Sequence, residues 1–296
     1  MLGKMREDIS LRFPSPLESY VWRGKKVYIK RDDLLHPLFN GNKARKFESL
    51  LYQPLEGRTL VSYGGNQSNA MFALSYIAKH KRCQFVYFTP PLSGYLQANI
   101  QGNLLYALQN GVRLEFVHGN LEALKHQALD FCTAQGGVFI PQGGSHAIAH
   151  MGIERLACEL QRDVVGLKDL AILYVSGSGV SAGILAHFFP CVVSVGAAGG
   201  ALYLAQMLQE AQAGTLEAIL APRAKIPFGK PNAELYAIYS EWLELGVEFD
   251  LIYDCLGWLC LYEHMERFAH RDIVFIHSGG LLGNHTQKQR YLRLQS

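Results

Sequence analysis

The sequence lacks the cysteine pairs and sequence motifs of several functional classes. Its six cysteines form no Cys-x-x-Cys pair, which argues against a zinc ribbon and a thioredoxin-like redox site and predicts free thiols in a reducing compartment. A P-loop ending in Gly-Lys-Ser/Thr and a His-Glu-x-x-His zinc motif are also missing. The N-terminal segment contains no apolar stretch typical of a secretory signal. We therefore expect a cytoplasmic protein that holds no metal.

The sequence also lacks an excess of one charge and a long apolar run. Lys and Arg number 28 against 25 Asp and Glu, and they are too scattered to form a basic stripe for nucleic acid. The uncharged stretch from Leu170 to Gln209 is interrupted by glycine-rich turns and by Pro190, so no run of about 20 apolar residues remains. Two buried strands flanking a buried helix explain it better than a membrane span. We expect neither nucleic acid nor a membrane as a partner.

Short apolar runs bounded by turn residues are what the sequence does contain. They predict buried strands at residues 26–29, 59–63, 84–88, 113–117, 137–140, 171–175, 192–195 and 273–276. Most are separated by enough residues for a crossover helix, which favours an α/β protein with mainly parallel sheets. The length of 296 residues allows one large domain or two of ordinary size, and the turn Pro141-Gln142-Gly143-Gly144-Ser145 is the best candidate boundary.

Three loops rich in glycine, serine and asparagine follow predicted strands, at the sheet edge where open α/β sheets bind ligands. The first, at 63–69, opens a helix capped by Ser68 or Asn69, so its N–H groups can hold an anion such as a carboxylate. The second, at 176–183, has the composition of an anion-binding nest and fits a phosphate. The third, at 277–280, is a weaker signal. Each loop is also compatible with a tight turn that binds nothing.

Lys43 lies in the first turn of a predicted helix, where the helix dipole disfavours a positive charge. With Arg45 and Lys46 it forms a basic run, and such runs are usually solvated. Alternatively, the helix end and the neighbouring cations lower the pKa of the Lys43 amine, which favours formation of a Schiff base. The residues alone leave both interpretations open.

Taken in order along the chain, these segments resemble one enzyme family. The run Gly41-Asn42-Lys43-x-Arg45-Lys46-x-Glu48, preceded by Lys30-Arg31-Asp32-Asp33-Leu34, looks like the lysine segment of pyridoxal-phosphate (PLP) enzymes of the tryptophan synthase β type, or fold type II. More narrowly, it is similar to the branch of D-cysteine desulfhydrase and 1-aminocyclopropane-1-carboxylate (ACC) deaminase. The resemblance implies a two-domain, three-layer αβα fold, with a small domain at 51–149, a large PLP domain at 1–50 and 150–296, and a homodimer.

The resemblance also implies roles for the lysine and for the first loop. Lys43 would hold PLP through a Schiff base and then move the substrate proton. Asn69 would bond the 3′-hydroxyl of PLP. Gln67 and Ser68 would hold the carboxylate of a small amino-acid substrate, with Ser68 assisting proton transfer.

Further roles follow from the same resemblance. Tyr253 would line the substrate pocket and take part in catalysis, and Phe228 stands where the family usually has a second pocket tyrosine. Ser278 would contact the pyridine nitrogen. The residues that would hold the phosphate are Ser176, Gly177, Ser178 and Gly179.

The group that faces the pyridine nitrogen tunes PLP as an electron sink. Ser278 resembles the hydroxyl of desulfhydrases, whereas Asp254 resembles the acid of deaminases, and we expect Ser278 to reach the nitrogen and Asp254 to fall short of it. This favours β-elimination from a small amino acid such as D-cysteine, giving pyruvate, ammonia and sulfide. The alternatives are ACC ring opening to 2-oxobutanoate and ammonia, and a PLP-binding homologue that has lost catalysis.

Overall fold

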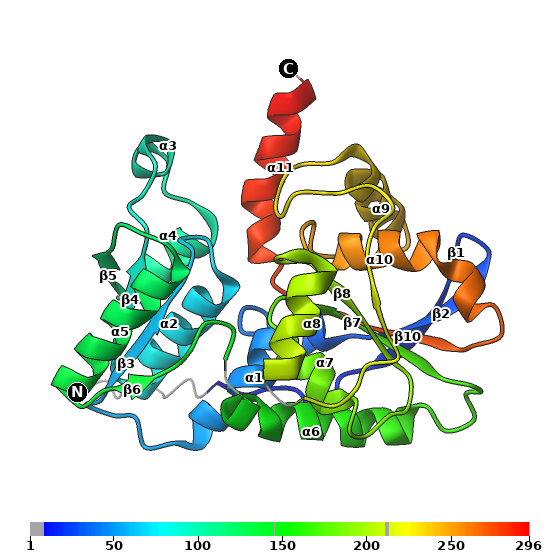
Figure 1. The fold of residues 1–296 in the computed structure, drawn as a ribbon, viewed down its shortest axis with the longest axis horizontal. Coiled ribbons are helices and arrows are strands. Elements are labelled where there is room, and N and C mark those ends of the chain that lie inside the picture. Colours follow the sequence, from blue (N-terminus) through cyan, green and yellow to red (C-terminus); the bar gives the residue numbers. More distant parts are fainter. Residues whose placement is uncertain (1–8, 145, 211–212, 296) are drawn as a thin grey trace, which may run out of the picture.

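Two mainly parallel sheets organise the molecule (Figure 1). The computed structural model describes residues 9–144, 146–210 and 213–295. Within these residues the larger sheet has the strand order β1 (Leu17–Trp22), β2 (Lys25–Lys30), β10 (Ile273–Ile276), β7 (Ala171–Ser176), β8 (Val192–Gly196) and β9 (Ala218–Leu220). The smaller sheet has the order β5 (Arg113–Phe116), β4 (Gln84–Thr89), β3 (Thr59–Tyr63) and β6 (Val138–Phe139). All described pairs are parallel except β1 with β2.

The expected α/β class with mainly parallel sheets is confirmed, and each predicted apolar run forms a strand. The apolar pattern does not predict β1 and β9, which are the two edge strands of the larger sheet. Most side chains of β1 are partly or fully exposed, and β9 is only 3 residues long. Edge strands bury little surface, so their sequences carry a weak strand signal.

Helices cover both faces of each sheet, because alternate strand residues point to opposite faces. Leu173 of β7 packs in the cluster formed with α9 and α10, whereas its neighbour Ile172 packs with α6 and α7. The same alternation places Leu60 with α1, α2 and α4, and Val61 with α5. The described α-helices are α1 (Gly41–Tyr52), α2 (Asn69–Lys81), α3 (Gly94–Ala98), α4 (Gly102–Gln109), α5 (Leu121–Gln135), α6 (His146–Asp163), α7 (Val180–Leu185), α8 (Gly200–Glu210), α9 (Ala233–Glu244), α10 (Asp254–Glu263) and α11 (Leu282–Gln295).

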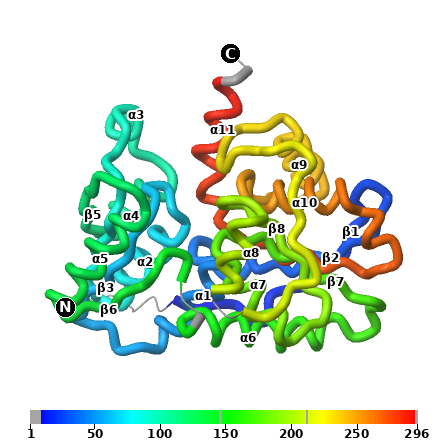
Figure 2. The backbone as a smooth tube through the Cα atoms, viewed as in Figure 1, coloured from blue at the N-terminus to red at the C-terminus, as the bar shows by residue number. Residues whose placement is uncertain are grey.

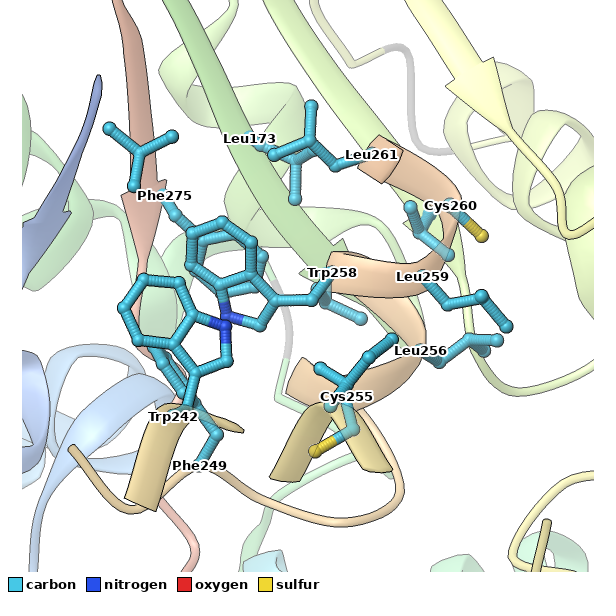
Figure 3. Close-up of a cluster of buried hydrophobic side chains, with 14 of the residues drawn as sticks. Leu173, Trp242, Phe249, Cys255, Leu256, Trp258, Leu259, Cys260, Leu261 and Phe275 are labelled. Atoms are coloured by element: carbon cyan, nitrogen blue, oxygen red, sulfur yellow. The ribbon is translucent and has the colours of Figure 1, made fainter. Parts of the chain in front are cut away.

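Aromatic side chains fill the core between α10 and the larger sheet (Figure 3). The ring of Trp258 stacks on Phe275 with centroids 4.2 Å apart, and the ring centroid of Trp242 lies 4.4 Å from that of Trp258. Such pairs add to the stability that the buried area already provides. This core fixes the first turn of α10, which carries part of the candidate site.

The two sheets lie side by side, with α1 between them and α11 rising beside α4 (Figure 2). Gly102, at the start of α4, has a φ of +61°, and a Cβ there would lie 2.6 Å from the side chain of Thr286 on α11. Strands at 59–139 build the smaller sheet, and strands at 17–30 and 171–276 build the larger one. The division into a small domain at 51–149 and a large one at 1–50 and 150–296 stays our proposal. Ser145, in the proposed boundary turn, lies outside the described residues.

A buried cluster of charges fixes the position of α1. The Arg45 guanidinium, which has no exposed surface, donates to Asp32 at 2.7 and 3.0 Å and to Glu159 of α6 at 2.8 Å on both oxygens. Lys30 adds a second cation 3.0 Å from Glu159. A buried guanidinium is tolerated only when its donors are paired in this way.

Among the described residues, no helix is long and apolar enough to span a membrane.

Helix α6 crosses α1 at very short range, and this crossing gives a test of the fold. A Cβ at Gly152 would overlap the backbone carbonyl of Arg45, which cannot rotate away. We expect Gly152→Ala to lower the free energy of unfolding by about 1–3 kcal/mol through overpacking, measured by urea denaturation. Gly94→Ala is the matched control, because a Cβ at Gly94 meets nothing within 4 Å. Equal stability of the two variants would contradict the crossing.

Candidate active site

The first turn of α1 is where the predicted site segments meet. The N–H of Asn42 donates to the carbonyl of Ser278 at 2.8 Å, and its side-chain oxygen accepts from Ser181 at 3.1 Å. Lys43 follows directly and lines a cavity of about 160 Å³ together with Asn69 and Gly280. Residues that follow β3 and β10 therefore lie beside Lys43, and Ser181 of α7 contacts its neighbour Asn42.

The Lys43 amine is poorly solvated. Burial lowers the pKa of Lys43 from 10.5 to about 8, because removal from water penalises the charged form. The start of α1 adds a positive dipole end next to the amine. A lysine in such a position has far more uncharged, nucleophilic amine near neutral pH than a solvated lysine has.

Lys46 is a candidate site residue that the sequence interpretation missed. It lies one turn after Lys43, and its amine donates to the carbonyl of Gly143 at 2.8 Å and to the Ser178 hydroxyl at 3.3 Å. Burial, with a smaller contribution from Lys43, shifts the pKa of Lys46 well below its usual value. The signal was present in the sequence, because residues three apart share one face of a helix.

The residues of the loop after β7 point in different directions. The Ser176 hydroxyl is buried and pairs with the Ser194 hydroxyl at 2.8 Å, so it points into the sheet rather than the loop. Gly177 faces open space, with the Tyr253 ring 3.8 Å from the position of a Cβ. Ser178 faces Lys46, and Gly179 has a φ of +77° with its Cβ position against Leu204 of α8.

At the start of α2, a buried amide fixes the orientation of Asn69. Ser68 caps the helix, accepting from the backbone N–H of Ala70 and Met71. Asn103, which the sequence interpretation did not single out, donates to the Asn69 side-chain oxygen at 2.6 Å. Asn69 therefore has its amide N–H groups left to donate. The side chain of Gln67 donates to the carbonyl of Gln101 at 3.1 Å, which holds this loop against the start of α4.

Tyr253 and Phe228 form one wall beside the loop after β7. Their rings meet edge to face with centroids 5.5 Å apart, and Phe228 is 53% exposed. The buried Asp250 carboxylate accepts from the N–H groups of Ile252 and Tyr253, which fixes the turn before α10. Burial raises the pKa of Tyr253, so its phenol stays neutral.

Ser278 and Asp254 lie next to each other at the end of β10. The Ser278 hydroxyl donates to the Asp254 carboxyl at 2.5 Å. Ser278 is partly exposed, whereas Asp254 has no exposed surface and also lies 3.2 Å from the ring of His277. The hydroxyl therefore covers the acid.

Comparison with known proteins identifies the family of this chain. The model of the family described as "Pyridoxal-phosphate dependent enzyme" matches residues 14–260. The chain belongs to this family. It is 30% identical to D-cysteine desulfhydrase of Salmonella paratyphi A, over 90% of this chain and 92% of that protein. It is 27% identical to a Thermotoga maritima protein provisionally named as an ACC deaminase, over 97% of this chain and 99% of that one.

A solved structure supports the same assignment of the fold. The crystal structure of an ACC deaminase homologue superposes with a TM-score of 0.78 at 22% identity, covering 96% of this chain and 95% of that chain. The expectations of a fold type II PLP enzyme and of PLP as cofactor are confirmed. The chain is a PLP-dependent lyase or deaminase of the group that contains these relatives.

The residues around Lys43 fit PLP. The cavity of about 160 Å³ is close to the volume that holds one aromatic ring in a protein interior. Lys43 would supply the amine, Lys46 and Ser178 would supply donors for a phosphate, and Gly177 would leave space for its approach. Among the described residues, no group of three His, Cys, Asp or Glu could hold a metal ion.

The lowered pKa of Lys43 can be tested in protein freed of its cofactor. The amine is charged below its pKa and reactive above it, so acetylation of Lys43 should rise with a midpoint near pH 8 rather than 10.5. Competitive labelling with acetic anhydride and peptide mass spectrometry measures this midpoint. Lys43→Met, which loses the labelled site, identifies the peptide. A midpoint near 10.5 would show that the amine is solvated.

Proposed function

We propose that this PLP-dependent enzyme catalyses β-elimination from a small D-amino acid such as D-cysteine, giving pyruvate, ammonia and sulfide. The observation that carries the proposal is that Ser278 is more exposed than Asp254. Ser278 is the partly exposed group of the pair, and Asp254 is buried beneath it with its Oδ1 atom bonded to the Ser278 hydroxyl. This supports a hydroxyl, as in desulfhydrases, rather than a carboxylate as the contact of the pyridine nitrogen.

Lys43 is the proposed catalytic residue. It would hold PLP, which when bound withdraws electrons from the substrate Cα. Its amine, once free, would take the proton from Cα, and a pKa of about 8 suits a general base that works near neutral pH. The position at the start of a buried helix keeps this amine poorly solvated between proton transfers.

The start of α2 is the proposed site of the substrate carboxylate. Ser68 accepts two backbone N–H bonds through its oxygen, and its hydroxyl, which hydrogen-bonds the Tyr87 phenol, would turn to donate to a carboxylate oxygen. The positive end of the helix dipole favours the anion. Gln67 is fixed by its bond to Gln101 and would contribute at the same end. Asn69, oriented by Asn103, would donate to the 3′-hydroxyl oxygen of PLP.

The loop after β7 is the proposed phosphate site. Ser178 and Lys46 would donate to the phosphate oxygens, and Gly177 and Gly179 would let the backbone approach. Ser176 would contribute through its backbone alone, because its hydroxyl is engaged with Ser194.

The wall of Tyr253 and Phe228 is the proposed boundary of the substrate side chain. Phe228 offers no hydroxyl, and its ring packs on the edge of the Tyr253 ring. The wall is therefore largely apolar, which suits a compact thiol or chloro substituent. Tyr253 adds one neutral phenol that can donate to the leaving group.

ACC deamination is the second candidate. Asp254 is a buried acid that is hydrogen-bonded to Ser278, the residue proposed to contact the pyridine nitrogen. A relative of 27% identity also carries the name of an ACC deaminase. ACC has no hydrogen on Cα, so opening its ring requires stronger electron withdrawal and a protonated pyridine. Ser278 covers Asp254, and this favours β-elimination.

The attachment site is tested by reduction. Borohydride treatment of the holoenzyme should fix the cofactor on the peptide that contains Lys43, since its amine is the one with a depressed pKa in the cavity. Mass spectrometry of the digest locates it. Lys43→Met should give no reduced adduct, whereas Lys225→Met should give the wild-type amount. An adduct on Lys46 or on another lysine would refute the role of Lys43.

The reaction is tested with a panel of substrates. D-cysteine and β-chloro-D-alanine should release pyruvate, and ACC should release no appreciable 2-oxobutanoate, because Ser278 rather than Asp254 is the exposed group. Quantifying the 2-oxo acids with lactate dehydrogenase and by chromatography separates the products, and Lys43→Met gives the background rate. Efficient ACC turnover would favour the second candidate. Cofactor binding without any product would indicate a homologue without catalysis.

A further inference from the structure

Asn103, in the first turn of α4, is a buried amide with one unpaired oxygen. Its side chain lines the cavity together with Lys43 and Asn69, and the residue is only 2% exposed. Its Nδ2 atom donates to the backbone carbonyl of Gln67 at 3.0 Å and to the side-chain oxygen of Asn69 at 2.6 Å. Its Oδ1 atom is buried and has no hydrogen-bond partner among the described residues. An unsatisfied buried acceptor is costly, so it requires an explanation.

The backbone carbonyl of Gln67 determines which way the Asn103 amide faces. A carbonyl can only accept, so the atom of Asn103 that faces it must be the nitrogen. If the amide were turned over, its oxygen would face the Gln67 carbonyl with no hydrogen between the two acceptors. The unpaired Oδ1 atom is therefore the consequence of keeping the nitrogen of Asn103 towards Gln67 and Asn69.

Asn103 in turn determines which way the Asn69 amide faces. The Asn69 atom that lies 2.6 Å from the Asn103 nitrogen accepts its hydrogen and is therefore the oxygen. The Asn69 nitrogen then lies towards the loop after β10. A Cβ at Gly280 would be 2.5 Å from this nitrogen but 3.5 Å from the Asn69 oxygen. Asn69 thus presents its N–H groups on the side of Gly280, which also lines the cavity and has no side chain to block them.

We propose that Asn103 is a positioning residue that, through Asn69, keeps the 3′-oxygen of bound PLP deprotonated. The inference rests on the proposed contact of Asn69 with that oxygen. A hydrogen-bond donor favours an oxygen without its proton, whereas an acceptor favours the protonated hydroxyl. Because Asn103 occupies the Asn69 oxygen, Asn69 has only the donor role left.

The proton that leaves the 3′-oxygen moves to the Schiff-base nitrogen formed with Lys43, so the number of protons is unchanged. The positive charge on that nitrogen makes the adjoining carbon more open to attack by the amine of an incoming substrate. PLP with a deprotonated 3′-oxygen absorbs visible light, whereas the form with a 3′-hydroxyl absorbs in the near ultraviolet. The role of Asn103 can therefore be measured without turnover.

An aspartate at residue 103 keeps the shape of the side chain but removes the second donor hydrogen. It carries at most one proton, which the Gln67 carbonyl takes, so Asn69 would turn its nitrogen towards residue 103 and its oxygen towards the cofactor. In the Asn103→Asp holoenzyme, absorption should shift from the visible to the near ultraviolet. Asn103→Ala, which adds no charge, should shift it in the same direction by a smaller amount. Asn110→Asp is the matched control, because Asn110 follows the same helix and donates to Ser75, and it should keep the wild-type spectrum.

A double variant tests whether Asn103 acts through Asn69. Asn69→Ala alone should also shift absorption to the near ultraviolet, and it should weaken binding of PLP to the cofactor-free protein about fivefold, the effect of one lost hydrogen bond. Adding Asn103→Asp to Asn69→Ala should then change neither the spectrum nor the affinity further. A further change would show that the new carboxyl acts on the cofactor directly or on the fold, and it would overturn the inference.

The outcomes separate this inference from the proposed function. A shift in Asn69→Ala, with none in Asn103→Asp and Asn103→Ala, would refute the role of Asn103 and leave the contact of Asn69 standing. A wild-type spectrum in all three variants would refute both. The expected shifts together with absence of pyruvate from D-cysteine in the wild-type enzyme would refute β-elimination and leave the role of Asn103 standing.

Discussion

The pairing of Arg45 is the interaction on which the site depends. One guanidinium with no exposed surface joins Asp32, which follows β2, to Glu159 on α6, and it belongs to the same helix as Lys43. Removing any one partner would leave an uncompensated charge in the interior. The cluster therefore allows α1 little freedom to slide or rotate. The Lys43 amine keeps its position because Arg45, on the same helix, is paired both with Asp32 and with Glu159.

With α1 fixed, the loops of three separate strands can be arranged around its first turn by short contacts. The carbonyl of Ser278 accepts from the backbone at Asn42, and Lys46 reaches the loop after β7. The turn that carries Gly143 accepts the same lysine. The parallel topology places these strand ends at neighbouring edges, and the helix connects the two sheets. Catalysis of the proposed kind needs such preorganisation, since poorly solvated amines and hydroxyls must not be free to pair with each other instead.

Sequence patterns predicted the strands of the fold well, but they did not predict the directions of individual side chains. Buried parallel strands form apolar runs, so every run singled out became a strand, while the edge strands β1 and β9 gave no comparable signal. Among the candidate site residues, Lys43 was selected by its place at a helix start and by family resemblance. Ser176 was grouped with the loop because its hydroxyl direction depends on the strand register, which the sequence does not state. The contact of Asp254 with Ser278 joins residues 24 positions apart and required the structure.

Gly102 connects the two sheets in a further way. Its missing side chain lets the start of α4 lie against Thr286 of α11, and a Cβ there would also come within 3.0 Å of the Gln67 side chain. Gln67 belongs to the loop that is proposed to hold the substrate carboxylate. A methyl group at residue 102 would therefore press on α11 and on this loop at once. The absence of one carbon atom at residue 102 therefore couples the placement of α11 to that of the proposed carboxylate loop.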